Sequence, residues 1–148
     1  AGFKVWLGEV RLVVARLRRW IFMRLLLLAC VGGAIGAGLR HIVNVGAFRL
    51  FGTAFPAGTL FVNVAGSFLM GILVEIILHR FDGSPELRTF AATGVLGGFT
   101  TFSAFSLDFA LLFERGDYGL AAVYLIASVG ASIVALFAGL GVARMALA

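Results

Sequence analysis

Apolar residues form four long blocks along the chain, and short polar connections separate them. Three of these blocks, residues 50–74, 89–107 and 118–143, contain no charged residue, and a fourth, residues 25–48, contains only Arg40. A run of about 18 or more apolar residues is long enough to cross the hydrocarbon core of a bilayer as a helix. The pattern therefore predicts an all-α integral membrane protein with four transmembrane helices.

Composition supports the same class of protein. Hydrophobic residues make up 61% of the 148 residues, mean hydropathy is +1.08, and charged residues make up 13%, against about 25% in typical soluble domains. The single cysteine, Cys30, has no partner for an intrachain disulfide, and we expect it to be a small buried apolar side chain. One membrane domain without a metal-binding or disulfide framework is the expected organisation.

The first 23 residues differ from the rest of the chain. Five basic residues and one acidic residue give this segment a net charge of +4, and apolar residues including Trp6 and Trp20 alternate with them. Such a sequence is typical of a basic amphipathic helix at a membrane surface. The alternative is an upstream extension to a functional protein that begins at Met23. We therefore divide the chain into an N-terminal extension, residues 1–23, and a transmembrane domain, residues 24–148.

Residues 94–106 combine features that weaken a helix inside an apolar block. Gly97 and Gly98 are adjacent, and the hydroxyl residues Thr100, Thr101 and Ser103 follow them. Glycine and hydroxyl side chains both favour departures from the helical backbone. Backbone groups freed in hydrocarbon are costly unless protein, water or an ion satisfies them. We predict that the third helix is broken near its middle and that its carbonyl groups face a cation.

Arg40 lies in or near the hydrocarbon region of the first block. A guanidinium there either extends to the headgroups or faces protein or a water-filled vestibule that concentrates anions. The preceding glycines, Gly32 and Gly36, with Gly33 and Ala37, have the small-xxx-small spacing that allows close helix packing. Both readings of Arg40 remain open on the sequence alone.

Side chains that could contact an anion recur on three of the predicted helices. On the second, Asn63 shares a helical face with Thr59, and it either joins helices or offers its NH2 group to an anion. On the fourth, Tyr124, Ser128 and Ser132 are spaced by four residues. On the third, phenylalanines spaced by three or four residues present positive ring edges, although such a stripe is more often core or lipid contact. The stripe comprises Phe102, Phe105, Phe109 and Phe113. Asp108 is expected to be solvated near the helix end.

These motifs together resemble the Fluc (CrcB-type) fluoride channels. The resemblance is carried by GGAIGAGLR at 32–40, FPAGTLFVNVAGSFLMG at 55–71 and GVLGGFTTFSAFS at 94–106, in the family's order and spacing. It covers the chain from about Arg24 onward and excludes the N-terminal extension. Ala104 stands where the family often has threonine, and Asp108 where it often has glutamate; the second change keeps the charge.

The resemblance implies a passive, fluoride-selective channel that exports fluoride from the cytoplasm and relieves its toxicity. It implies an antiparallel, dual-topology homodimer in a bacterial-type inner membrane, with no enzymatic activity and no nucleic-acid partner. A structural sodium ion would be bound by the carbonyls of Gly97 and Thr100 of both subunits. Fluoride would pass Asn63, Phe102, Phe105, Thr59, Tyr124, Ser128 and Ser132, and Arg40 would line the vestibule.

Three other classes of protein fit the sequence less well. A small four-helix proton-coupled multidrug exporter needs a carboxylate deep in a span, whereas Glu75 and Asp108 lie toward span ends. A scaffold protein would explain the glycines by packing but not the aligned donors and phenylalanines. An intramembrane enzyme would need paired catalytic side chains at depth, and none are evident from the sequence.

Overall fold

Helices make up all the regular structure that the computed structural model describes, which is residues 2–148 for the backbone, and residues 11, 14 and 16–148 for side chains. The elements follow one another in a simple order along the chain. They are α1 (Gly2–Phe51), α2 (Ala57–Arg80), α3 (Pro85–Leu87), the π-helix η1 (Arg88–Leu96), α4 (Gly97–Phe99), α5 (Phe102–Glu114) and α6 (Tyr118–Leu147).

Four helical stretches are long and apolar enough to cross a membrane. They are Arg16–Phe51, Ala57–Arg80, Pro85–Glu114 and Tyr118–Leu147. The prediction of an all-helical, four-span chain is confirmed, and the protein is a multi-pass membrane protein. Helix α1 is longer than the predicted first span, because it passes through residues 23 and 24 without a break.

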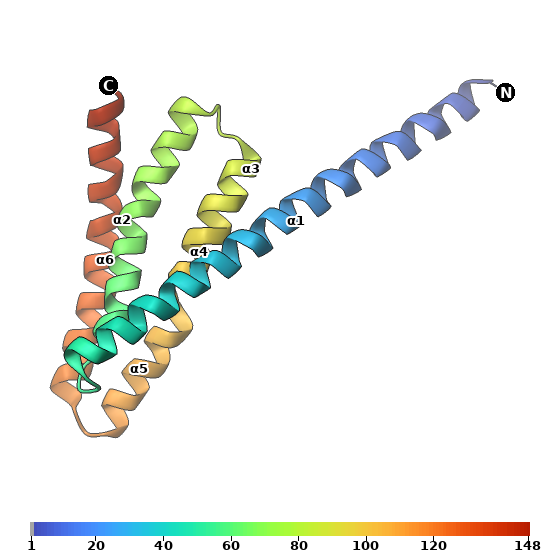
Figure 1. Ribbon diagram of the computed structural model, residues 1–148. Coiled ribbons are helices and arrows are strands. Elements are labelled where there is room, and N and C mark those ends of the chain that lie inside the picture. Colours follow the sequence, from blue (N-terminus) through green and yellow to red (C-terminus); the bar gives the residue numbers. More distant parts are fainter. Residues whose placement is uncertain (1) are drawn as a thin grey trace.

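Helices α2 and α6 lie side by side along most of their length (Figure 1). Two glycines bring their backbones together. A methyl group added at Gly71 would collide with the backbone of Leu136 and Leu140, and one added at Gly139 would collide with the Phe68 carbonyl. Small residues allow this approach in membranes, where helix association depends on close packing. The pair forms the frame against which the other helices pack.

Helix α1 crosses η1 and α4 at a second seam of glycines. A Cβ atom at Gly32 would lie 3.0 Å from Gly94 Cα, and one at Gly36 would lie 2.8 Å from Phe99 N. A Cβ at Gly33 would meet nothing within 4 Å, but the Gly33 backbone itself abuts Gly98. Toward its N-terminus, α1 leaves the other helices and projects away from them (Figure 1).

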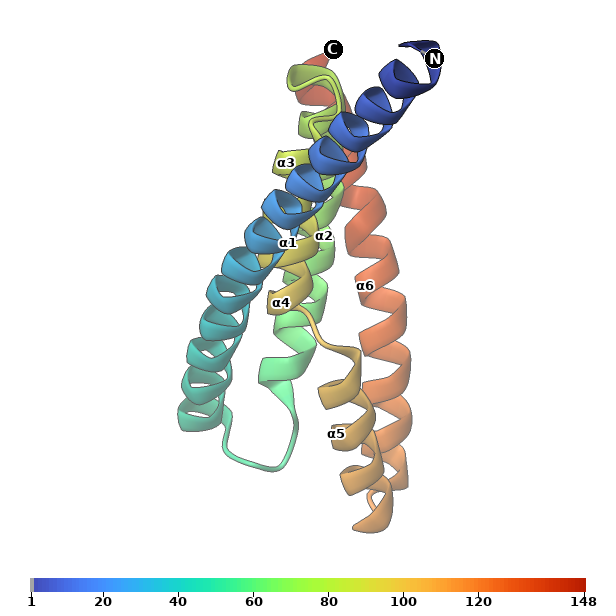
Figure 2. The ribbon, with the colours of Figure 1, turned by 90° about the vertical axis from the view of Figure 1, so that its right-hand side faces the viewer.

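The third apolar stretch is helical on both sides of two extended residues. Helical backbone continues from Pro85 through α3, η1 and α4 to Phe99, and α5 begins at Phe102. Between them, Thr100 (φ −80°, ψ 158°) and Thr101 (φ −156°, ψ 120°) are extended, and Figure 2 shows the thin connection from α4 to α5. Gly97 (φ −65°, ψ −34°) is helical, so the glycines are not the residues at which the backbone leaves the helix.

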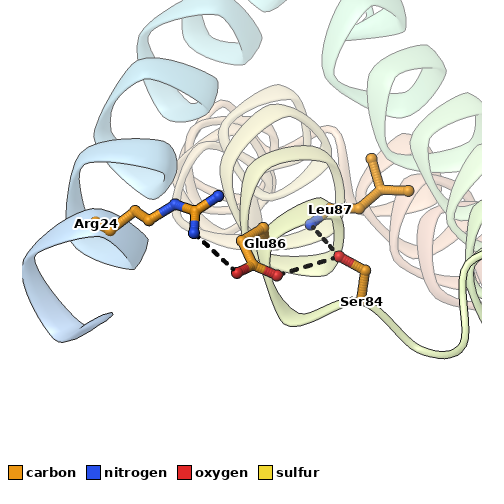
Figure 3. Close-up of polar contacts among 4 residues, drawn as sticks. All are labelled: Arg24, Ser84, Glu86 and Leu87. Atoms are coloured by element: carbon orange, nitrogen blue, oxygen red, sulfur yellow. Dashed lines mark hydrogen bonds and ion pairs between the residues drawn. The ribbon is translucent and has the colours of Figure 1, made fainter. Parts of the chain in front are cut away.

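Ionic contacts link the helices at the end of the molecule that carries the turn between α2 and α3. Arg24 of α1 lies 3.4 Å from a Glu86 carboxylate oxygen, while Ser84 caps the next helix by accepting a hydrogen bond from the Leu87 N–H (Figure 3). At the same end of α2 and α6, Arg144 Nε donates to Glu75 Oε1 at 2.6 Å. The Glu75 carboxylate is thus buried with a charged partner rather than alone.

The outward surfaces of all four stretches are apolar and exposed in the single chain. Large side chains with at least half of their surface exposed include Leu27, Phe61, Ile126 and Val134. Lipid or another protein chain is the environment in which such a surface is stable. Cys30 is also exposed, so the prediction that it is buried was wrong: it lies on an outward face of α1.

Candidate functional site

A cavity of about 590 Å³ lies between the extended residues and α6. We call it the serine cavity, because Ser128 and Ser132 of α6 line it. It brings together seven of the residues predicted to form the site. Those seven are Asn63, Gly97, Thr100, Phe102, Phe105, Ser128 and Ser132.

The hydroxyls of Ser128 and Ser132 are buried and have no hydrogen-bond partner among the described residues. Serine in a helix ordinarily donates back to the carbonyl four residues earlier, and neither of these does. They come from α6 one turn apart, so both face the cavity. Each therefore presents a hydroxyl donor to whatever the cavity contains.

Asn63 holds the backbone of the extended segment. Its Oδ1 accepts from the Thr101 N–H at 2.7 Å, and its Nδ2 donates to the Thr101 carbonyl at 3.0 Å. An amide side chain has two N–H donors, so one remains for the cavity. Asn63 thus joins α2 to the third stretch, which is one of the two roles that the sequence left open, and its contact with an anion stays a prediction.

The carbonyls of Gly97 and Thr100 are among those released from the helical ladder at this point. In a continuous helix the Thr101 N–H would bond to the Gly97 carbonyl, but it donates to Asn63. The Ala104 N–H would bond to the Thr100 carbonyl, but it donates to Thr101 Oγ1 at 3.2 Å. Both carbonyls are therefore available to another donor or to a cation.

Aromatic rings close one end of the serine cavity. Phe105 packs between Phe102 and Tyr124, with ring centroids 5.3 Å apart in each case. Phe55 meets Tyr124 edge to face at 5.6 Å. Phe102 is 77% exposed and Tyr124 is fully buried, so the cluster runs from the open face of the molecule into its core.

A second cavity of about 360 Å³ lies beyond the aromatic rings, next to the turn between α1 and α2. We call it the loop cavity; Thr59, Asp108, Asn44 and Arg115 are among its lining residues. Tyr124 Oη donates to Asp108 Oδ2 at 3.2 Å. Asp108 is half-buried and bound to a buried tyrosine, so its predicted simple solvation at a helix end was wrong.

The remaining predicted residues lie around the two cavities. Thr59 is buried and lines the loop cavity rather than the serine cavity. Tyr124 lines neither cavity and forms part of the wall between them. Arg40 Nη1 lies 3.4 Å from the Thr100 carbonyl, beside the extended residues.

Sequence reasoning gave no role to the Thr101 backbone or to the bond between Tyr124 and Asp108. Thr101 was recognised only as a hydroxyl residue, and its backbone pairing with Asn63 depends on helices that are distant in the sequence. No local spacing signals such a contact. The Asp108 contact could have been suspected, since Asp108 lies on the same predicted helix as the phenylalanine stripe.

Comparison with known sequences shows the family to which this chain belongs. The family model described as "CrcB-like protein, Camphor Resistance (CrcB)" matches residues 27–140. The chain belongs to the CrcB family. Curated CrcB-family relatives include a protein of Chelativorans sp. (strain BNC1), 60% identical over 122 residues, which are 82% of this chain and 98% of the relative.

Two further relatives of this CrcB-family chain come from Mesorhizobium japonicum and Agrobacterium fabrum. The first is 57% identical over 80% of this chain and 95% of its own length, and the second is 56% identical over 79% and 94%. All three relatives carry the name "Fluoride-specific ion channel FluC". The family resemblance inferred from the sequence motifs is confirmed.

Proposed function

We propose that this chain forms a fluoride-selective channel that exports fluoride from the cytoplasm and so relieves fluoride toxicity. The observation that carries the proposal is the pair of buried, unpartnered hydroxyls of Ser128 and Ser132 in the serine cavity. CrcB-family relatives more than half identical to this chain are named as fluoride-specific ion channels. They are named as channels rather than enzymes, in agreement with the expectation that the chain is not an enzyme.

The lining of the serine cavity suits a small anion. Fluoride leaving water must find hydrogen-bond donors, and the cavity offers hydroxyls of Ser128 and Ser132 and one N–H of Asn63. Phe102 and Phe105 can add their positive ring edges. None of these groups carries a full charge, so an anion can bind and still leave, as conduction requires.

The route we propose continues past the aromatic rings to the loop cavity. Tyr124 and Thr59 lie at that boundary and supply hydroxyl groups. The fully buried Tyr124 ring separates the two cavities in this structure. A small displacement of Tyr124 or Phe105 is therefore needed for passage, and Asp108 holds the tyrosine hydroxyl on the far side.

We further propose that the third membrane helix is broken at Thr100 and Thr101 to bind a structural sodium ion. The carbonyls of Gly97 and Thr100 have lost their helical donors to Asn63 and Thr101 Oγ1. Carbonyl oxygens are suitable ligands for a hard cation, as in the unwound helices of transporters. When bound, the ion supplies positive charge that stabilises backbone oxygens otherwise costly in hydrocarbon.

The proposed assembly is an antiparallel homodimer in the bacterial inner membrane. Phe102 is 77% exposed beside an open cavity that is lined by polar residues and by apolar ones such as Val129 and Ile133. A second copy facing this surface would cover Phe102 and add its own carbonyls to the sodium site. The residues 1–23 extension lies outside the proposed channel domain of residues 24–148, and the family match begins at residue 27.

No observation favours the multidrug exporter. Its proton-coupled mechanism requires a free carboxylate deep in a span. Glu75 accepts a hydrogen bond from Arg144, and Asp108 accepts one from Tyr124. Neither carboxylate is therefore free to exchange protons with a transported cation.

Fluoride efflux from liposomes that contain the purified full-length protein tests the proposal. We expect rapid fluoride efflux down its gradient, no comparable chloride efflux, and no need for a proton gradient. Empty liposomes serve as the control. Efflux that requires a proton gradient, equal passage of chloride, or transport of a cationic dye instead of fluoride would each contradict the proposed function.

A further inference from the structure

The glycine seam of α1 leads directly to Arg40. Gly32, Gly36 and Arg40 are spaced by four residues and therefore share one face of the helix. Successive positions on this face contact successive parts of the third stretch: Gly32 lies against Gly94, and Gly36 lies against Phe99. The next turn of α1 then brings Arg40 beside the extended residues.

Arg40 is the donor that reaches one of the freed carbonyls. Its Nη1 lies 3.4 Å from the Thr100 carbonyl oxygen, in a partly buried position. The amide that would otherwise serve this carbonyl, Ala104 N–H, donates to Thr101 Oγ1. The guanidinium is therefore placed on the backbone of the break itself, and it is not simply a free charge in a vestibule.

We infer that Arg40 shares the Thr100 carbonyl with the bound cation and thereby sets how tightly the break binds sodium. This inference rests on the proposed sodium site. A carbonyl oxygen has two lone pairs and can accept from a guanidinium while it coordinates an ion. Two positive charges on one oxygen repel each other, and the repulsion is strong where water is excluded. Arg40 is thus a positioning residue that stabilises the open backbone and weakens the sodium site.

Sodium-dependent thermal unfolding of the purified full-length protein tests the inference. The midpoint temperature is measured against sodium chloride concentration, with choline chloride holding the ionic strength constant, because a ligand that binds only the folded state raises the midpoint. Arg40→Gln removes the charge and keeps a donor. We expect half-maximal stabilisation at about ten-fold lower sodium than in the wild type, or lower still, because the Coulomb repulsion is gone.

Two variants separate this effect from a general loss of charge. Arg40→Lys keeps the positive charge and should need sodium within about three-fold of the wild-type concentration. Arg49→Gln removes an exposed charge from the same helix, nine residues further on, and should leave the sodium dependence unchanged. If Arg40→Gln does not fold, Arg40→Met provides the neutral comparison with a side chain that tolerates an apolar setting.

Each result decides between distinct conclusions. Equal or weaker sodium dependence in the neutral Arg40 variants, or an equal change in Arg49→Gln, would overturn the role of Arg40 and leave the sodium site itself standing. Unfolding that is insensitive to sodium in the wild type and in every variant would overturn both. Sodium dependence that appears only in the neutral Arg40 variants would overturn the proposed sharing, since Arg40 would then exclude the ion from the wild-type site.

Discussion

Asn63 connects α2 to the extended residues through two hydrogen bonds to Thr101. Asn63→Ala removes both, and each buried backbone group left without a partner costs about 1–3 kcal/mol. We expect a clear fall in the thermal unfolding midpoint and a loss of most fluoride efflux. Asn44→Ala is a matched control for the unfolding measurement, because Asn44 lines the loop cavity and makes no hydrogen bond to Thr101. We call the two hydrogen bonds between Asn63 and Thr101 the Asn63 clamp. An unchanged unfolding midpoint in Asn63→Ala would show that the clamp does not stabilise the fold.

Asn63→Asp separates the clamp from conduction. An aspartate can still accept from the Thr101 N–H, but it cannot donate to the Thr101 carbonyl, and its charge repels an anion in the serine cavity. Fluoride efflux should therefore fall further in this variant than its thermal stability does. Efflux at the wild-type level would remove Asn63 from the fluoride route.

Phe102 tests the aromatic part of the lining. Phe102→Ile keeps an apolar side chain of roughly similar size but removes the ring edge. We expect reduced fluoride efflux with an unchanged oligomeric state in size-exclusion chromatography, since isoleucine keeps an apolar side chain on the surface that a second copy would cover. Phe61→Ile changes an exposed phenylalanine that lines neither cavity, and its efflux should match the wild type. Wild-type efflux in Phe102→Ile would exclude Phe102 from the pore.

Tyr124→Phe removes one hydroxyl and leaves the ring in place. The lost bond to the Asp108 carboxylate should destabilise the fold by about 1.5–3 kcal/mol, the range for a hydrogen bond to a charged group. Fluoride efflux should also fall, because the variant lacks the hydroxyl that could turn from Asp108 to a passing ion. The other tyrosine, Tyr118, is exposed, and Tyr118→Phe is the control in unfolding and efflux measurements. Equal effects of the two substitutions would argue against a special role for Tyr124.

Individual site residues could be predicted where one helix carries the signal. Ser128 and Ser132 are one turn apart, and that spacing alone predicts a shared face, which the serine cavity confirms. The partners of Asn63 could not be predicted in this way, because Thr101 lies 38 residues away and meets it only through packing of two helices. The same holds for Arg40 and the Thr100 carbonyl, which are 60 residues apart.

At the scale of elements, the contact of α1 with η1 and α4 depends on the absence of side chains. A Cβ at Gly36 would meet the Val95 carbonyl and lie 2.8 Å from Phe99 N, so Gly36→Ala must push α1 away from the break. We expect destabilisation by about 1–3 kcal/mol, the usual cost of overpacking, together with reduced efflux. Both are measured by thermal unfolding and the liposome assay.

Gly38→Ala provides the comparison for Gly36→Ala on the same helix. A Cβ at Gly38 meets nothing within 4 Å, and alanine is favoured over glycine in a helix by about 1 kcal/mol. This variant should therefore unfold at the wild-type temperature or above it. A similar loss of stability in both variants would contradict the seam, because a Cβ at Gly38 meets nothing and alanine raises helix propensity at both positions.

The helices were largely predictable from hydrophobic run length, although the uncharged block at residues 50–74 begins in α1 and crosses the turn before α2. The local backbone in the third stretch was not. Gly97 and Gly98 suggested the place of least helical preference, yet both are helical in α4, and the extended residues are Thr100 and Thr101. Propensity is a weak influence compared with tertiary contacts, and here Asn63 supplies the contacts that hold Thr101 extended.

For the whole molecule, basic residues at the two ends of the helices bear on how the chain inserts. Counted from residue 24, the end with the α2–α3 turn has Arg24, Arg80, Arg88 and Arg144, and the opposite side has three arginines. A difference of four to three is too small to fix orientation under the positive-inside rule. Residues 1–23 add five basic residues to the first side, which is enough to favour a cytoplasmic N-terminus.

Accessibility of terminal tags in intact cells tests this conflict between the extension and a dual topology. The full-length chain should insert mainly with both termini in the cytoplasm, because nine basic residues against three give a strong bias. A form without residues 1–22 should insert in both orientations, with each terminal tag labelled from outside in part of the population. Since an antiparallel dimer of identical chains requires both orientations, the short form should also show the higher fluoride efflux in cells. A single orientation for the short form would rule out dual topology, and mixed orientations for the full-length chain would show that the extension does not govern insertion.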